Sequence, residues 1–336
     1  MLARVAGRCL VQQRGALPQH SQLRPQARRL AVRASQDECM RSISDNGQVS
    51  ILVVRGTQLV QEACDRHKTS PTASAALGRA LLGTLLMGAF REEGEKTQVT
   101  FKGDGPLNGI QVIADARGLV KGKVGNPAAD PPLRPDGKLN VGQAVGRGVL
   151  AVVRSLPAAR GFETPYTGMV PIHSGEIAED LARYLVDSEQ TQSALGLGVS
   201  IHRDLSIKAA GGFLIQVLPF AEDETILQLE KNIVAAGSMT QMLNEGLTVA
   251  DITGLLLEGL GGNDTGFQLQ PRYGPCEPAG LQERMRSAVA LLGEKEVREI
   301  IDQQGKIEVT CEFCRETYEF PEEEVMVVIA ANGGVP

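Results

Sequence analysis

The sequence of 336 residues predicts an α+β protein: an N-terminal antiparallel-sheet domain with packed helices, then a helical linker, then a small C-terminal zinc-binding module. Short β-type segments separated by turn signals run from 97 to about 155. From about 222, three helical segments follow without a strand signal. Near the C-terminus, two cysteines at CxxC spacing lie in the strand-like stretch 309–320. We therefore expect domains at 41–221, 222–268 and 269–330.

The first 34 residues form a basic leader. They hold seven arginines and no acidic residue, and the first carboxylate of the chain is Asp37. An Arg-rich segment without a compact apolar core is typical of an organelle transit peptide. We expect cleavage after Ala34, in VRAS, and a protein of the chloroplast stroma, with the mitochondrial matrix as the alternative. A basic arm kept in the mature protein is the remaining interpretation.

Charge and hydropathy argue against two classes of partner. The formal net charge is −6, and loss of the leader would leave roughly −13. A protein that binds the phosphate backbone depends on Lys and Arg, so we expect no nucleic-acid partner. No stretch approaches the ~18 consecutive apolar residues of a spanning helix, so we expect no membrane partner.

The N-terminal domain begins with β-branched and helical patterns. Buried or paired strands are predicted where apolar residues gather, at 49–55, 197–204 and 211–219. Residues 69–90 favour a helix because Ala and Leu fill its body and Pro71 suits its first turn. Ser70 or Thr69 can cap this helix.

A second helix is predicted over 173–190, with Ser174 as its N-cap. Its apolar residues recur at helical spacing and should face the core: Ile177, Leu181, Tyr184 and Leu185. Its early acidic residues are expected on a solvated face near the positive end of the helix dipole, rather than in a catalytic pair: Glu176, Glu179 and Asp180. Glu189, at the end of this segment, has no assigned reaction.

The linker at 222–268 is predicted to contain three short helices that each end in Gly. Thr248 with Asp251 fits the weaker, Asp form of a capping box. Short helices are marginal alone and depend on docking, so we expect the linker to be less stable than the sheet domain. Its candidate docking residues are Met239, Met242, Leu255, Leu256 and Leu257.

The C-terminal segment carries the informative cysteines. Two helices, 280–292 and 294–304, lead into a hairpin with Cys311 and Cys314, and Pro321 begins a last helix. A hairpin knuckle places two thiolates as tetrahedral zinc requires, and zinc sites take two ligands from each of two such places. A thioredoxin-like redox pair is the alternative, although it needs a helix N-terminus at the first cysteine.

Cys276 lies 35 positions before Cys311 and supplies a third thiolate. Between 220 and 336 there is no fourth cysteine and no histidine. Glu277, a water molecule or a partner could complete the coordination sphere. The remaining cysteines of the mature chain, Cys39 and Cys64, are expected to be ordinary thiols.

Four segments in the same order resemble the redox-regulated 33 kDa heat-shock chaperone family, heat-shock protein 33. They are FKGDGPLNGIQVIADARGLVKGKVGNP at 101–127, SGEIAEDLARYLVDSEQ at 174–190, GGFLIQVLP at 211–219 and VTCEFC at 309–314. The resemblance runs from about 45 to 330, which is nearly all of the mature chain.

The resemblance implies an ATP-independent holdase rather than an enzyme. In that family a CxC and a CxxC bind one zinc ion in the reduced state. Oxidation joins the cysteines within each pair, releases zinc and unfolds the linker, and the exposed apolar surface then binds unfolding client proteins, typically as a homodimer. On this resemblance Cys276, Cys311 and Cys314 are metal ligands, and Cys311 and Cys314 form the redox disulfide.

The chain departs from the family pattern at the first pair. Only Cys276 stands where a CxC is expected, in YGPCEP, so no disulfide can form within that pair. We expect that the Cys311–Cys314 disulfide still forms. The missing thiol should lower the threshold for linker release and leave partial activity in the reduced state.

Two other classes compete with the chaperone. One is an RNA- or protein-modifying enzyme with a zinc ribbon, for which the chain offers no clear nucleotide loop or acid/base cluster. The other is a thiol oxidoreductase that uses Cys311 and Cys314 as its dithiol.

Overall fold

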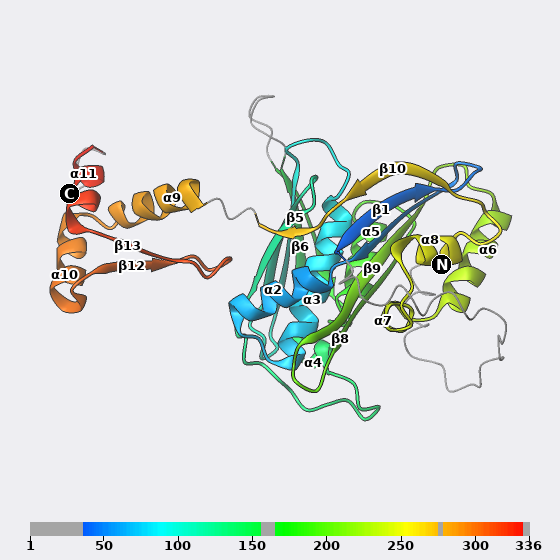
Figure 1. Cartoon of the computed structure of the whole chain (residues 1–336), viewed down its shortest axis with the longest axis horizontal. Helices are drawn as coiled ribbons and strands as arrows, with labels where there is room; N and C mark the ends of the chain where they lie inside the picture. The colour runs from blue at the N-terminus through cyan, green and yellow to red at the C-terminus, as the bar shows by residue number, and fades with distance from the viewer. Residues whose placement is uncertain (1–35, 156–164, 275–277, 332–336) are drawn as a thin grey trace. The chain divides into compact units, whose positions relative to one another are not determined.

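A computed structural model describes residues 36–155, 165–274 and 278–331 (Figure 1). It divides the chain into two compact units, one ending at Arg272 and one beginning at Tyr273. The predicted leader, 1–34, and Cys276 lie outside the described residues.

The first unit contains a five-stranded antiparallel sheet, which we call sheet A. Its strand order is β10-β1-β2-β9-β8. The strands are β1 Glu38–Ile43, β2 Val49–Arg55, β8 Ser193–Ile201, β9 Ile207–Val217 and β10 Asn263–Leu269. The predicted strand at 49–55 is confirmed with the same bounds, because its β-branched run pairs with β1 on one side and β9 on the other.

A second sheet, sheet B, has the order β11-β5-β4-β3-β6-β7. Its strands are β3 Lys96–Gly103, β4 Ile110–Asp115, β5 Leu119–Val124, β6 Gly148–Ser155, β7 Tyr166–Ile172 and the two-residue β11 Arg272–Tyr273. β3 to β7 pair with their neighbours in antiparallel fashion. The predicted hairpins between 97 and 155 are therefore confirmed.

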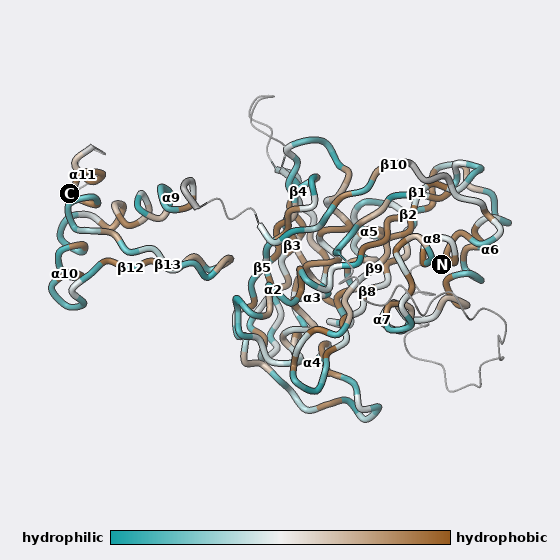
Figure 2. The backbone as a smooth tube through the Cα atoms, in the orientation of Figure 1, coloured by the Kyte–Doolittle hydropathy of each residue, from teal (hydrophilic) through white to brown (hydrophobic). Residues whose placement is uncertain are grey.

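Helix α3, Pro71–Gly88, is the core of this unit. It contacts β4 and β5 of sheet B and β8 and β9 of sheet A, and nearly all its residues are buried. Ser70 accepts a hydrogen bond from the backbone N–H of Ala73 and Pro71 opens the helix, as predicted. A side chain at Gly78 would meet Val60 at 2.6 Å, so the glycine permits the close packing. Figure 2 shows hydrophobic stretches along the strands and α3.

The other helices of this part are α2 Thr57–His67, α4 Val141–Val145 and α5 Ala178–Asp187. The prediction for the start of α5 was wrong. The helix begins at Ala178, and no side chain caps it. The buried Asp180 instead accepts hydrogen bonds from the backbone N–H groups of His173, Ser174 and Gly175, at 2.7, 3.0 and 2.8 Å.

Asp180 is therefore not part of a solvated face, because its carboxylate holds the turn that precedes the helix. Glu176 accepts from Arg79 at 2.8 Å and Arg134 at 3.2 Å, and Glu179 is half-buried. The four side chains that were predicted to face the core are all buried. They are Ile177, which is the N-cap residue, and Leu181, Tyr184 and Leu185 of the helix.

The linker helices are α6 Asp223–Ala236, α7 Met239–Asn244 and α8 Val249–Leu256. The predicted capping box of α8 is present, with Thr248 accepting from Asp251 N–H at 3.1 Å and Asp251 accepting from Thr248 N–H at 2.9 Å. The helices pack on one face of sheet A. No helix in the described ranges combines the length and apolar character needed to cross a bilayer.

The absence of a strand signal after 222 was misleading. Residues Asn263–Leu269 form β10, which pairs with β1 at the edge of sheet A. The sequence NDTGFQL lacks alternating apolar residues, so its pairing depends on a strand more than 200 residues earlier.

The second unit contains α9 Pro278–Ala290, α10 Glu294–Gln304, β12 Ile307–Thr310, β13 Thr317–Phe320 and α11 Glu322–Ala331. These are the helices and the hairpin that the sequence predicts. The unit has a small apolar core of its own, built on Val289, Val297, Ile307, Phe320, Val325 and Ile329. Such a small core supplies limited stability, so a metal or another cross-link would matter here.

Candidate metal and redox site

Cys311 and Cys314 lie on a tight knuckle at the end of the β12–β13 hairpin. The hairpin is regular from Ile307↔Phe320 to Thr310↔Thr317. Beyond it, Cys311 N–H donates to the carbonyl of Glu316 at 2.9 Å, and Arg315 N–H donates to the carbonyl of Cys311 at 2.9 Å. The sequence prediction of a knuckle between two strands is confirmed.

The knuckle includes one residue in an unfavourable backbone conformation. Arg315, which directly follows Cys314, has φ of 59°. The left-handed region favours glycine, because a β-carbon there approaches the following carbonyl oxygen. The hydrogen bonds around Cys311 therefore hold Arg315 in a conformation that it would otherwise seldom adopt.

Both cysteine side chains are buried in an apolar setting. Cys311 and Cys314 are 6% and 1% exposed, and they cluster with the buried Leu281. Tyr273, Met285, Phe313 and Tyr318 pack around this cluster. No disulfide joins the cysteines that lie within the described ranges. The two side chains that would form the redox pair are thus held together on one knuckle.

A tyrosine from the start of this unit contacts the knuckle. The hydroxyl of Tyr273 donates a hydrogen bond to the carbonyl oxygen of Phe313, between the two cysteines. This contact joins positions 40 residues apart in the chain. The backbone of the knuckle is therefore connected to the segment through which the chain enters the unit.

The residues present fit half of a zinc site. Tetrahedral zinc takes pairs of thiolates from knuckles of this type, and Cys311 and Cys314 supply one pair. Among the described residues, no further Cys, His, Asp or Glu joins them in a group of three or more. Cys276, the third predicted ligand, lies outside the described part of the chain. The full ligand set stays a prediction.

The other two described cysteines belong to the first unit. Cys39 lies on β1 and Cys64 in α2, and both are buried. Burial raises the pKa of Cys39 to about 12 and also raises the pKa of Cys64. A thiol with a raised pKa forms little of the reactive thiolate at neutral pH, which agrees with the prediction that these are ordinary thiols.

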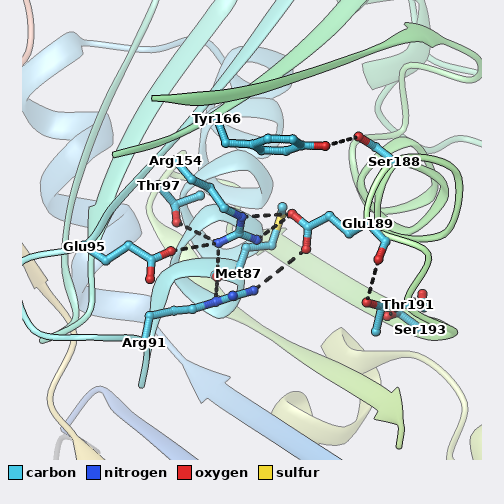
Figure 3. Close-up of polar contacts among 10 residues, drawn as sticks. All are labelled: Met87, Arg91, Glu95, Thr97, Arg154, Tyr166, Ser188, Glu189, Thr191 and Ser193. Atoms are coloured by element: carbon cyan, nitrogen blue, oxygen red, sulfur yellow. Dashed lines mark hydrogen bonds and ion pairs between the residues drawn. The ribbon is translucent and has the colours of Figure 1, made fainter. Parts of the chain in front are cut away.

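Sequence reasoning missed a buried ion-pair network in the first unit (Figure 3). Arg154 of β6 donates to Glu189, after α5, at 2.9 and 2.7 Å, and to Glu95 at 3.4 Å. Arg91 lies 3.8 Å from Glu189, and burial together with the charge of Arg154 lowers its pKa. Glu189 thus has a structural partner. Its 35-residue separation from Arg154 leaves no local sequence signal.

Comparison with known proteins identifies the family. The family model described as Hsp33 protein matches residues 37–321. The chain belongs to the Hsp33 family. The resemblance drawn from the four sequence segments is therefore confirmed. The plastid address stays a prediction, because the Hsp33 relatives with which this chain is compared are bacterial proteins.

Curated Hsp33 relatives match along most of their length. The 33 kDa chaperonin of Geobacter sulfurreducens is 44% identical over 290 residues, which cover 86% of this chain and 93% of the relative. The 33 kDa chaperonin of Clostridioides difficile is 40% identical over 300 residues, covering 87% and 98%. These proteins are named as chaperonins, so the relatives support a chaperone rather than an enzyme.

A solved Hsp33 structure shows the same fold. The crystal structure of the 33 kDa chaperonin (heat shock protein 33 homolog) of Thermotoga maritima is 32% identical, with a TM-score of 0.79. The match covers 89% of this chain and 99% of that one. The mixed α+β architecture with antiparallel sheets is therefore that of the Hsp33 family.

Proposed function

We propose that this chain is a redox-regulated, ATP-independent holdase whose client-binding surface is covered by α6–α8 in the reduced state. The observation that carries the proposal is the apolar cluster between these helices and sheet A. Sheet A contributes Val49, Ile51, Val53, Ala194, Phe213 and Ile215. The linker contributes Leu229, Ile233, Met239, Met242, Val249, Ile252, Leu256 and Leu257. Release of the helices would expose both surfaces, and large exposed apolar patches bind other proteins.

Besides the apolar cluster, polar contacts attach the segment that contains α6–α8 to the rest of the unit. Arg55 donates to the carbonyl of Leu247 at 2.5 Å. The side-chain oxygen of Gln48 accepts from Glu222 N–H at 3.1 Å and from the Thr225 hydroxyl at 2.7 Å. Short helices held by docking belong to the low-stability part of a fold. A modest loss of restraint would therefore release them while sheet A stays folded.

Oxidation of the knuckle is the proposed trigger. Hydrogen peroxide would take two electrons from Cys311 and Cys314 as their sulfur atoms join, and the two thiol protons would end in water. Zinc, when bound, would keep both sulfurs as thiolates and add folding free energy to the small second unit. Cys311, Cys314 and Cys276 are the proposed ligands. A disulfide removes the thiolates, so metal binding and its stabilisation are lost together.

The incomplete first pair should make this switch more sensitive than a two-disulfide switch. Only one intrapair disulfide, Cys311–Cys314, can form, and three thiolates hold the metal less firmly than four. We propose a lower oxidant threshold, some activity in the reduced state, and a homodimer in the oxidised state. Unfolded client proteins are the proposed partners.

The decisive test measures zinc content and suppression of light scattering by a heat-denaturing client on one sample, before and after peroxide. Zinc loss with stoichiometric suppression supports the holdase. Cys314→Ser should abolish the response to peroxide, while the control Cys64→Ser keeps it. Absence of suppression in both states would refute the proposal. Catalytic insulin reduction that is lost in Cys311→Ser would favour an oxidoreductase.

We propose the chloroplast stroma as the location, with the mitochondrial matrix as the alternative. The support is the seven arginines and missing carboxylates of residues 1–34. A fluorescent reporter fused after residue 40 should accumulate in plastids of a plant cell. Accumulation in mitochondria would select the alternative, and a cytosolic reporter would contradict both.

A further inference from the structure

β10 pairs with β1 at the edge of sheet A, and the side chains at its C-terminal end are poorly buried. The side chains of Phe267 and Gln268 are exposed, and that of Leu269 is half-buried. The register with β1 shifts between Met40 and Ser42, so the ladder is irregular. In the chain, β10 lies between the linker helix α8 and the second unit, so it belongs to the segment that a released linker would pull on.

β1 has a more complete ladder on its other side. All six of its residues pair with β2, from Glu38↔Arg55 to Ile43↔Ser50, and β2 pairs in turn with β9. Cys39 of β1 is fully buried. β1 would therefore remain in the sheet after β10 has left. Its outer edge would then present N–H and C=O groups without strand partners, which is a template for pairing with another extended chain.

We propose that linker release also removes β10 from β1, and that the vacated edge of β1 binds an extended segment of a non-native client by main-chain pairing. This inference rests on the proposed holdase function. Main-chain hydrogen bonds are available to any sequence, so an edge strand suits clients that share only their lack of a native fold. The pairing also lies beside the apolar face that α6–α8 cover, because Met40 packs against that cluster.

The surroundings of β10 indicate which side chains the edge would accept. On the face opposite Met40, Arg41 lines a cavity of about 730 Å³ whose exposed lining is more polar than apolar but includes Phe90 and Phe220. The ring of Phe90 meets that of Phe267 edge-on, with centroids 6.1 Å apart. Departure of β10 would break this contact and leave the ring of Phe90 available to a client side chain. The favoured client segment is therefore extended, with apolar side chains on the Met40 face and an aromatic side chain where Phe267 meets Phe90.

A cross-strand disulfide tests whether β10 must leave. Gln268 is the register partner of Met40, and their side chains approach to 4.0 Å. The variant Met40→Cys/Gln268→Cys would lock β10, while Met40→Cys/Gln268→Ser is the matched control that cannot cross-link. After peroxide treatment, protease cleavage within 223–256 should be the same in both, whereas suppression of client light scattering should be roughly tenfold weaker in the locked variant. Equal suppression would overturn the inference but leave the holdase intact.

Hydrogen exchange on the unmodified protein gives a second, independent readout. The β1 amides that bond to β10 should lose protection on activation and regain it when denatured client is added. If they stay protected in activated protein without client, either β10 has not left or a second copy occupies the edge, and the proposal fails. It also fails if client binds but the amides remain unprotected. A protein that suppresses no aggregation at all would instead contradict the proposed function.

Discussion

The hydroxyl of Tyr273 donates a hydrogen bond to the carbonyl oxygen of Phe313, the third residue of the CEFC sequence. Tyr273 lies four residues after Leu269, where β10 ends. The backbone of the cysteine knuckle is thus joined, through one side chain and a short stretch of chain, to the strand that covers β1.

Replacing Tyr273 by Phe removes that hydrogen bond and keeps the ring. The loss should destabilise the knuckle by about 0.5–1.5 kcal/mol. Amide exchange of Cys311 and Arg315 in the reduced protein should therefore accelerate roughly 2- to 12-fold. Tyr166→Phe, which loses a hydroxyl contact to Ser188 in the first unit, is the control and should leave these amides unchanged. Identical exchange in both variants would show that the Tyr273 contact carries no stability.

Arg315→Gly should stabilise the hairpin, because glycine adopts the observed φ of 59° without strain. The expected gain is about 0.5–1 kcal/mol, since part of the relief is offset by the greater freedom of glycine in the unfolded chain. Slower amide exchange of Cys311 would report it. Arg315→Ala removes the same charge but keeps the β-carbon, so it should show no gain. A gain of equal size in both variants would assign the effect to charge instead of backbone strain.

Two adjacent leucines of the linker offer a matched test of docking. Leu256 is fully buried against sheet A, whereas Leu255 is 40% exposed. Leu256→Ala should weaken docking by about 2–5 kcal/mol, and Leu255→Ala by less than about 0.5 kcal/mol. Reduced Leu256→Ala should therefore suppress client aggregation without peroxide and be cleaved faster within 223–256. If neither variant gains activity in the reduced state, the docked linker is not what keeps the protein dormant.

The parts of the fold that were predictable carry local signals. The knuckle follows from CxxC between two strands, α3 from Ser70 and Pro71, and the start of α8 from the Thr248–Asp251 pair. What failed depends on distant partners. β10 is polar and exists through pairing with β1, so no periodicity marks it.

The same distinction applies to the candidate site. Spacing was enough to place Cys311 and Cys314 on one knuckle, whereas the contact between Tyr273 and Phe313 joins residues that only the folded unit brings together. Outside the candidate site, the start of α5 was also mispredicted, because Ser174 looked like an N-cap by residue type. Asp180 takes the backbone N–H groups instead, because its position inside the first turn points its carboxylate back at them.

The buried network around Arg154 should make the first unit sensitive to the loss of one partner. The side chains of Arg154 and Glu189 are only 12% and 15% exposed, so removal of Glu189 leaves the buried Arg154 with the longer, 3.4 Å contact to Glu95 as its ion pair. Glu189→Ala should lower the free energy of unfolding by about 3–5 kcal/mol. Asp187→Asn breaks the exposed Arg183–Asp187 pair nearby and should cost about 0.3–0.5 kcal/mol. If the thermal unfolding midpoints of the two variants fell equally, the expected difference between the buried network and the exposed pair would be contradicted.

Cys39 should remain unreactive in every folded state of the protein. Burial raises its pKa to about 12, so it forms very little of the reactive thiolate at pH 8. Iodoacetamide at pH 8, followed by peptide mass mapping, should therefore leave Cys39 unmodified in reduced and in peroxide-activated protein. Unfolding in urea is the control, and there the thiol should react fully.

The alkylation result for peroxide-activated protein also tests whether β1 stays in sheet A. Because the pKa of Cys39 is higher in the folded protein than in the unfolded chain, its contribution to stability is complete below about pH 9 and is lost as the pH rises towards 12. At pH 8 that contribution is intact, so alkylation requires the side chain of Cys39 to lose the burial that raises its pKa. Modification of Cys39 after peroxide treatment would contradict a β1 strand that stays packed in sheet A, which is the state that client pairing requires. Continued protection of Cys39, together with lost amide protection on the β10 side of β1, is the combination that an open edge requires.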